Sequence, residues 1–421
     1  MADETLARLR SRAESFLEQR TAAIQRVHGG TARAEALRAV HQRYPVLLSA
    51  DAVTEVQRAL AGATGEEEQQ LRFLLEFLVD HRAAWAAESA GEGRLAWEAG
   101  VELPGAARPV PARALADVLA ETRDPLERRA LAAAWYDALE DLDPVLETAL
   151  QREREVVEEV GYGGYTDARA VLGGYDVRAL ARDAGRLLAD TDEQYRELLA
   201  WYLPRMADGV TPEEASWADV ARLHRAEPYD EYFPAGGALA TVRVRLGAMG
   251  LDLGAGGRLH LEHVAGGPAE TRTHVIRVPE HVVLSVGTAP GRRGYARLLR
   301  ELGRALHRAY TSPDLPFAFR WLGDRSVSLG FGALLRGLMR SPDWLTRVHG
   351  LRGERQRDYM RFEVLVELFA LRQHAARLLY EIERFDSGAG SDRFVELLTD
   401  ATGMQTHPAT HLWVVRPGFA V

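Results

Sequence analysis

Most of the chain carries apolar residues at the spacing of an α-helix. Leu, Val, Ala and aromatic residues recur at i, i+3 and i+4, positions that share one helix face. Glycine and proline residues divide this pattern into segments. The predicted helices span residues 3–28, 31–43, 51–61, 65–89, 112–120, 124–139, 143–160, 177–206, 212–225, 294–310, 325–340, 358–385 and 391–402. The pattern therefore predicts a mostly α-helical protein.

A second pattern, with a period of two, lies just before the helix at 294–310. Val, Ile and Leu alternate there with polar residues, which is typical of β-strands. The predicted strands are Arg258–Val264, Thr271–Val278 and His281–Val286, with turns at Gly266-Gly267-Pro268 and Pro279-Glu280. A weaker β-like pattern, which includes Leu95 and Trp97, lies within residues 91–111. The sequence thus predicts one small sheet in an otherwise helical chain.

Two Gly/Tyr turns lie near the middle of the chain, at Gly161–Tyr165 and Gly173–Tyr175. Clusters of glycine interrupt helices and give the backbone unusual freedom. We therefore expect a hinge there, between an N-terminal helical lobe (residues 1–170) and a second lobe (residues 171–421).

Composition excludes several classes of protein. The chain has 52 basic and 61 acidic residues, and a formal charge of -9 argues against a broad nucleic-acid surface. With no cysteine, disulfides, thiolate catalysis and cysteine-ligated metals are excluded. Residues 1–20 lack the apolar core of a signal peptide. No apolar run approaches the ~18–20 residues that span a bilayer, so we expect a cytoplasmic protein with no membrane partner.

The helix predicted at 294–310 has two chemically different sides. Its apolar side contains Tyr295, Leu298, Leu299, Leu302, Ala305, Leu306 and Ala309, and the other contains Arg297, Arg300, Glu301, Arg304 and His307. Taken alone, this pattern is typical of a surface helix. The pairs Arg297–Glu301 and Glu301–Arg304 would each contribute about 0.2–0.5 kcal/mol.

The same run resembles the zinc helix of the thimet oligopeptidase/oligoendopeptidase F family of zinc metallopeptidases. The family motif, His-Glu-x-Gly-His-x-x-His, falls on residues 300–307. Glu301, Gly303 and His307 match, whereas Arg300 and Arg304 occupy the positions of the two histidine ligands. The family's third ligand, a glutamate on the following helix, falls on Leu329.

The resemblance covers most of the chain, from about Arg43 onward. Further matching segments are Arg272–Pro290, Gly323–Phe331, Ser341–Leu345 and Leu371–Glu381. They imply a mostly α, two-lobed, zincin-type scaffold with its small sheet before the pseudo-active-site helix. Thr399–Phe419 resembles the segment that leads into the family's tyrosine-rich helix. The resemblance therefore implies that the second lobe is truncated at its C-terminal end.

The residues at the ligand positions predict that zinc does not bind. A guanidinium has no lone pair to offer and stays protonated, and Leu329 offers only hydrocarbon. Without zinc there is no Lewis acid and no activated water, so Glu301 is interpreted as a vestigial general base. The resemblance implies further candidates to line the pocket, namely Arg297, His307, His274 and Asp324.

Other histidines provide weak candidates for a metal site. His260, Glu262, His263 and His274 lie on neighbouring predicted strands, but alternation puts His263 on the opposite face from His260 and Glu262. His407 and His411 are four residues apart, but Pro408 disfavours a regular helix there. We therefore expect no metal and no other cofactor.

Three functions remain open. The leading hypothesis is a catalytically inactive homologue that binds a peptide or protein partner, such as an active paralogue. Arg300 and Arg304 would then bind a carboxylate, unless they only pair with Glu301 and fill the channel. The second hypothesis is a metal-free enzyme with Glu301 as base and the two arginines as donors. The third, weaker one is a zinc peptidase with other ligands.

Overall fold

The computed structural model describes most of the chain. Its described residues are 2–29, 31–33, 35–87, 94, 97, 98, 100–105, 108–234, 237–263, 271–287, 289 and 291–414. The predicted turn at residues 266–268 and the predicted strand residue Leu95 lie outside these ranges. No described helix is both long enough and apolar enough to cross a membrane.

The contacts within the chain divide it into two compact units. Unit 1 contains Met1–Trp85 and Tyr229–Arg352, and unit 2 contains Ala86–Pro228 and Gly353–Val421. Each unit therefore combines segments that are far apart in the sequence. The division differs from the expected boundary at residues 170/171, which lies inside the helix α9 (Tyr165–Gly173) of unit 2. The Gly/Tyr turns bound this short helix and do not separate the units.

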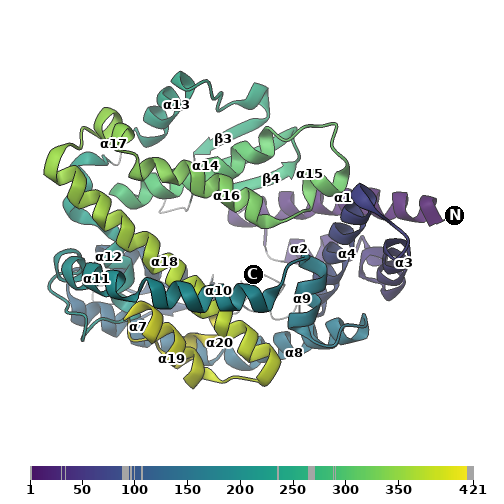
Figure 1. The fold of residues 1–421 in the computed structure, drawn as a ribbon, viewed down its shortest axis with the longest axis horizontal. Helices are drawn as coiled ribbons and strands as arrows, with labels where there is room; N and C mark the ends of the chain where they lie inside the picture. Colours follow the sequence, from purple (N-terminus) through teal and green to yellow (C-terminus); the bar gives the residue numbers. More distant parts are fainter. Residues whose placement is uncertain are drawn as a thin grey trace. The chain divides into compact units, whose positions relative to one another are not determined.

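Unit 1 consists of helices around a small sheet. Its helices are α1 (Ala2–His28), α2 (Glu35–His41), α3 (Ala50–Leu60), α4 (Gly65–Ala86), α13 (Ala238–Ala248), α14 (Gly291–Ala309), α15 (Phe317–Trp321), α16 (Arg325–Arg336) and α17 (Pro342–His349). Helix α1 packs on strand β4, α14 packs on β4 and β5, and α16 packs on α14 (Figure 1). Helix α14 thus lies between the sheet and α16.

The sheet has the strand order β3-β5-β4, with β3 at Leu259–His263, β4 at Arg272–Arg277 and β5 at His281–Val286. All three agree with the predicted strands to within one residue at each end. Strand β5 is central, runs parallel to β3 and antiparallel to β4, and buries Val282, Val283 and Leu284. This apolar run explains why β5 occupies the middle of the sheet.

Unit 2 is almost entirely helical. It contains α6 (Leu115–Glu121), α7 (Pro125–Glu140), α8 (Asp143–Glu159), α9, α10 (Val177–Asp190), α11 (Asp192–Met206), α12 (Trp217–Arg225), α18 (Gly353–Ser387), α19 (Ser391–Thr402) and α20 (His411–Val414). A two-stranded ribbon joins Glu102–Leu103 (β1) to Val110–Pro111 (β2) within the region of the weaker β-like pattern. The single helix predicted at 177–206 is interrupted at Thr191, whose hydroxyl binds the carbonyl of Leu187.

Candidate functional site

Helix α14 presents its apolar side to the interior, as its periodicity predicted. Tyr295, Leu298, Leu299, Leu302 and Leu306 are all buried. The prediction of a solvated polar side is wrong for Glu301, which is only 5% exposed. A carboxylate is buried at tolerable cost only when hydrogen bonds replace its water, and neighbouring residues supply these bonds.

Three residues surround the Glu301 carboxylate. The backbone N–H of Thr273 on β4 donates to Oε2 at 3.2 Å, and Nη1 of Arg304 donates to Oε1 at 3.1 Å. Nε of Arg300 lies 3.5 Å from Oε1. The Thr273 hydroxyl also donates to the Glu301 carbonyl at 2.9 Å. Glu301 therefore connects α14 to the sheet and holds the two arginines together.

Arg300 and Arg304 retain N–H donors that no group in the described residues accepts. The Arg300 side chain is 53% exposed and, within the described part of the chain, forms no hydrogen bond beyond its close approach to Glu301. The Arg304 side chain is 39% exposed and donates only through Nη1, while its Nε is buried without a partner. Nη1 and Nη2 of Arg300 and Nη2 of Arg304 thus remain to meet an anion, whereas the buried Nε of Arg304 does not.

Two glycines bring α14 and α16 into backbone contact. A Cβ atom on Gly303 would lie 2.2 Å from the Phe331 carbonyl oxygen, and one on Gly332 would lie 2.9 Å from the Arg300 carbonyl oxygen. The Cγ atoms of Arg304 and Arg300 would be 3.1 and 3.3 Å from the latter Cβ. Both arginine stems therefore pack over Gly332, and the close approach explains the need for glycine at position 303.

Leu329 and Asp324 both belong to α16. Leu329 lies one turn before Gly332, so the two residues share a helix face, and Leu329 is 53% exposed. Asp324 is the N-cap of α16 and accepts a hydrogen bond from the Ser326 N–H at 2.7 Å. Leu329 thus lies on the face of α16 that meets the arginine stems, whereas Asp324 has a capping role.

The remaining candidates are packed more tightly. His307 stacks on Phe331 with ring centroids 4.8 Å apart, its Nδ1 is buried without a partner, and burial lowers its pKa. His274 is 5% exposed and lies 5.4 Å from the His28 ring; burial, and then the charge of Arg272, lower its pKa. Arg297 is half-buried on α14, one turn before Arg300.

The histidines outside this site have other contacts. The His260 ring packs on His281 at 4.7 Å, and Glu262 accepts from Gln25 at 3.2 Å. His407 stacks on Tyr136 at 4.1 Å, while His411 lies 2.9 Å from the Pro408 carbonyl. Among the described residues, no three His, Asp or Glu side chains gather as a metal site would require.

Comparison with known proteins identifies the fold. No protein-family model matches the sequence, and neither does any curated protein sequence. The structure is similar to that of a protein described as an oligoendopeptidase F from Bacillus anthracis str. Ames, with a TM-score of 0.59, 11% identity, and coverage of 95% of this chain and 83% of the other. It is also similar to PZ peptidase A with an inhibitor, with a TM-score of 0.58, 11% identity, and coverage of 98% and 82%.

These similarities confirm the predicted fold class, a mostly α, peptidase-like scaffold of two parts. Identity this low shows a shared fold and says nothing of activity, which depends on the site residues. The residues that the resemblance places at the zinc positions are Arg300, Arg304 and Leu329, and none of them has a lone pair that zinc could use. This side-chain set does not fit a zinc ion.

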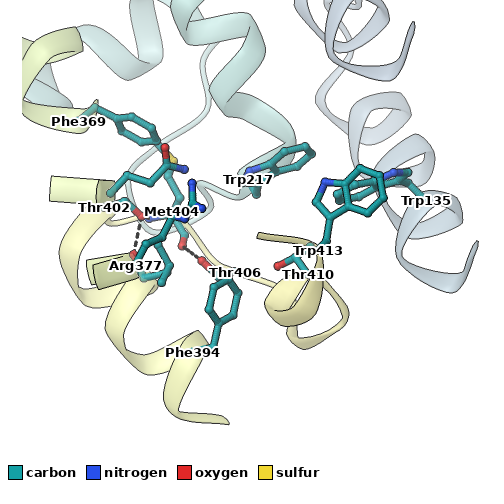
Figure 2. Close-up of a pocket in the computed structure, with 12 residues that line it drawn as sticks. Trp135, Trp217, Phe369, Arg377, Phe394, Thr402, Met404, Thr406, Thr410 and Trp413 are labelled. Atoms are coloured by element: carbon teal, nitrogen blue, oxygen red, sulfur yellow. Dashed lines mark hydrogen bonds between the residues drawn. The ribbon is translucent and has the colours of Figure 1, made fainter. Parts of the chain in front are cut away.

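Sequence reasoning missed two parts of the molecule. Thr273 and Gly332 both position the arginine pair, yet a lone threonine in a strand and a lone glycine in a helix gave no signal. It also missed a hollow in unit 2 (Figure 2), lined by aromatic residues that include Trp135, Trp217 and Trp413. The Trp135 and Trp217 rings stack 5.0 Å apart, and these indoles are spread over helices that are distant in sequence.

Proposed function

We propose that this chain is a non-catalytic peptide-binding protein, in which Arg300 and Arg304 bind the carboxylate of a peptide C-terminus. One observation carries the proposal: two half-exposed guanidiniums share a single carboxylate and keep unused donors. The side chains of both arginines are partly exposed, so a ligand can approach the donors that Glu301 does not use.

Guanidinium and carboxylate are matched in geometry as well as charge. Two parallel N–H groups of an arginine meet the two oxygens of a carboxylate, and such bonds are stronger than those between neutral groups. The stems of both arginines pack over Gly332, and side chains that are packed before binding lose less entropy when a ligand binds. The arginine pair is therefore suited to an anion with a flat, two-oxygen end.

The burial of Glu301 disfavours the metal-free enzyme. A general base must come within hydrogen-bond reach of the proton that it removes. Both Glu301 oxygens already accept hydrogen bonds from Thr273 and Arg304, and the residue is 5% exposed. Zinc content and the cleavage of a quenched fluorescent peptide test both catalytic alternatives. One zinc per chain with cleavage would support a zinc peptidase, and cleavage by zinc-free protein would support the metal-free enzyme.

Calorimetric titration with acetyl-Gly-Gly-Leu tests the proposal directly. The free acid should bind and the C-terminal amide should bind at least about tenfold more weakly, because the amide lacks the charge that the arginines recognise. The double variant Arg300→Gln, Arg304→Gln should lose the preference, whereas Arg58→Gln, at an exposed arginine of the same unit, should retain it. Equal binding of acid and amide, or binding of neither, would contradict the proposal.

The assignment of the three former ligand positions has a test of its own. We expect Arg300→His, Arg304→His and Leu329→Glu together to create a zinc site, because they restore the donors that zinc prefers. Zinc uptake is measured by competition with a chromogenic chelator. A triple variant that folds but binds zinc no better than the parent would show that Leu329 is misplaced.

A further inference from the structure

An exposed leucine adjoins the arginine pair. Leu329 is 53% exposed and lies on the face of α16 where Gly332 meets the stems of Arg300 and Arg304. Exposed single leucines are common on protein surfaces. This one shares a helix face with Gly332, over which the stems of two cations with unused donors pack. An apolar surface and an anion-binding surface are therefore side by side.

The C-terminal residue of a peptide would contact both surfaces at once. In the last residue of a peptide, the α-carboxylate and the side chain are attached to the same Cα atom, so the two groups are always close together. The carboxylate satisfies the guanidiniums, and an apolar side chain covers the hydrocarbon of Leu329, which is favourable in water. A polar or charged side chain would lose water there without gaining a partner.

Building on the proposed carboxylate site, we infer that the protein selects peptides whose C-terminal residue is apolar, with that side chain packed on Leu329. Carboxylate capture would supply the general affinity, and Leu329 would supply the discrimination among carboxylates. Such a division between a charge that binds and an apolar contact that selects is typical of peptide recognition.

Another face of α16 provides a matched control. Leu334 is 68% exposed and lies two residues after Gly332, so its side chain points about 200° away around the helix. Substituting serine there removes somewhat more exposed hydrocarbon than at Leu329, at 68% against 53% exposure, but leaves the arginine side of the helix unchanged.

The experiment compares four acetylated tripeptides by calorimetry: Gly-Gly-Leu, Gly-Gly-Gly and Gly-Gly-Asp as free acids, and Gly-Gly-Leu as the amide. We expect the Leu acid to bind about tenfold tighter than the Gly and Asp acids, which corresponds to one partly covered apolar side chain. Leu329→Ser should remove this difference, and Leu334→Ser should leave it intact. Thermal denaturation checks that both variants are folded.

The outcomes separate the inference from the function on which it rests. If all three acids bind equally and the amide does not, the carboxylate site stands and the apolar selectivity is wrong. If Leu329→Ser keeps the preference for the Leu acid, Leu329 is not the selecting residue and the inference is also wrong. If the amide binds as well as the acid, or if no peptide binds, the proposed function itself fails.

Discussion

The arginines of α14 contrast sharply with two arginines in unit 2. Arg128 is fully buried, and each of its three guanidinium nitrogens donates hydrogen bonds. Nε and Nη2 donate to Asp219 at 2.9 and 2.8 Å, Nη1 donates to the carbonyls of Thr122 and Arg123, and Nη2 also reaches the Ala207 carbonyl. Asp219 itself is fully buried. This network holds α7 and α12 together.

Arg372 of α18 is satisfied in the same way. Its Nε donates to the Ala401 carbonyl at 2.6 Å, Nη1 donates to the Leu188 carbonyl and the Thr191 hydroxyl, and Nη2 donates to Asp192 at 2.6 Å. Its guanidinium also lies over the Tyr195 ring at 4.8 Å from the centroid. No donor atom of this arginine remains for a ligand.

The two pairs of arginines differ in burial and in how many of their donors the protein already uses. In a chain without lysine, residue type says nothing about the role of a basic residue. The number of donors already used by the protein does distinguish the roles, because a buried unpaired donor is costly whereas an exposed one is solvated. All donor atoms of Arg128 and Arg372 are used within the fold, whereas Arg300 and Arg304 keep donors that the proposed ligand would use.

The largest expected effect on stability is that of Arg128→Leu, which tests this contrast. It should lower the free energy of unfolding by about 3–5 kcal/mol, because it leaves the Asp219 carboxylate buried without its counter-charge. Urea denaturation measures the change. Arg152→Gln, which removes an exposed ion pair with Glu155 in the same unit, should cost no more than about 0.5 kcal/mol. Similar losses of unfolding free energy in both variants would contradict the contrast between buried and exposed arginines.

Two histidines of unit 1 show the effect of burial on side chains that titrate near neutral pH. His41 and His81 pack on Phe16 and are 7% and 6% exposed. Burial lowers the pKa of His41 to about 4 and that of His81 to about 2, with smaller effects from the charge of Arg20 and, for His81, from His41. The folded state therefore excludes protons that the unfolded state accepts.

Stability of unit 1 should accordingly fall as the pH drops below 6.5. Each histidine should cost roughly 1.5 kcal/mol between pH 6.5 and 5, because the slope approaches about 1.36 kcal/mol per pH unit only once the unfolded histidine is fully protonated. Hydrogen exchange of the α4 amides measures the loss. His81→Phe should flatten the pH dependence, whereas His374→Ala, at an exposed position of unit 2, should leave it unchanged. An identical slope in the His81→Phe protein would exclude this explanation.

Gly303→Ala should disturb the packing of α14 on α16 and so the position of the arginine pair. The new Cβ would meet the Phe331 carbonyl at 2.2 Å, so α14 and α16 must separate, at a cost of about 1–3 kcal/mol. Gly330→Ala meets nothing within 4 Å on α16 and should instead stabilise by about 0.5–1 kcal/mol. Thermal denaturation of the two variants gives the comparison, and a neutral Gly303→Ala would mean that the helices are not in backbone contact.

The smallest expected effect on stability is that of Arg300→Gln. Its side chain is 53% exposed and forms only a 3.5 Å ion pair, so the free energy of unfolding should change by no more than about 0.5 kcal/mol. Urea denaturation is again the measurement. A loss near that of Arg128→Leu would place Arg300 among the structural arginines and remove the basis for a ligand there.

The sequence predicted those features that depend on local pattern. Helix α14 and strand β5 were predicted because their apolar residues follow the periods of helix and strand. The two units were not predicted. Residues 1–85 and 229–352 form one unit only through contacts between segments that are distant in the sequence. Glu301 was assigned to the solvated side because it is charged. Its burial depends on Thr273, which lies 28 residues earlier in the chain.

The glycine pair has a consequence for how this fold changes over evolutionary time. Gly303 and Gly332 lie where the main chains of α14 and α16 meet, so a larger residue at either position would force neighbouring atoms to move. Arg300 and Arg304 on α14 and Leu329 on α16 lie close in sequence to these glycines, so substitutions there change the chemistry of the surface while the glycine contact is retained. The glycine contact therefore constrains the residues that form it more strongly than the side chains exposed beside it.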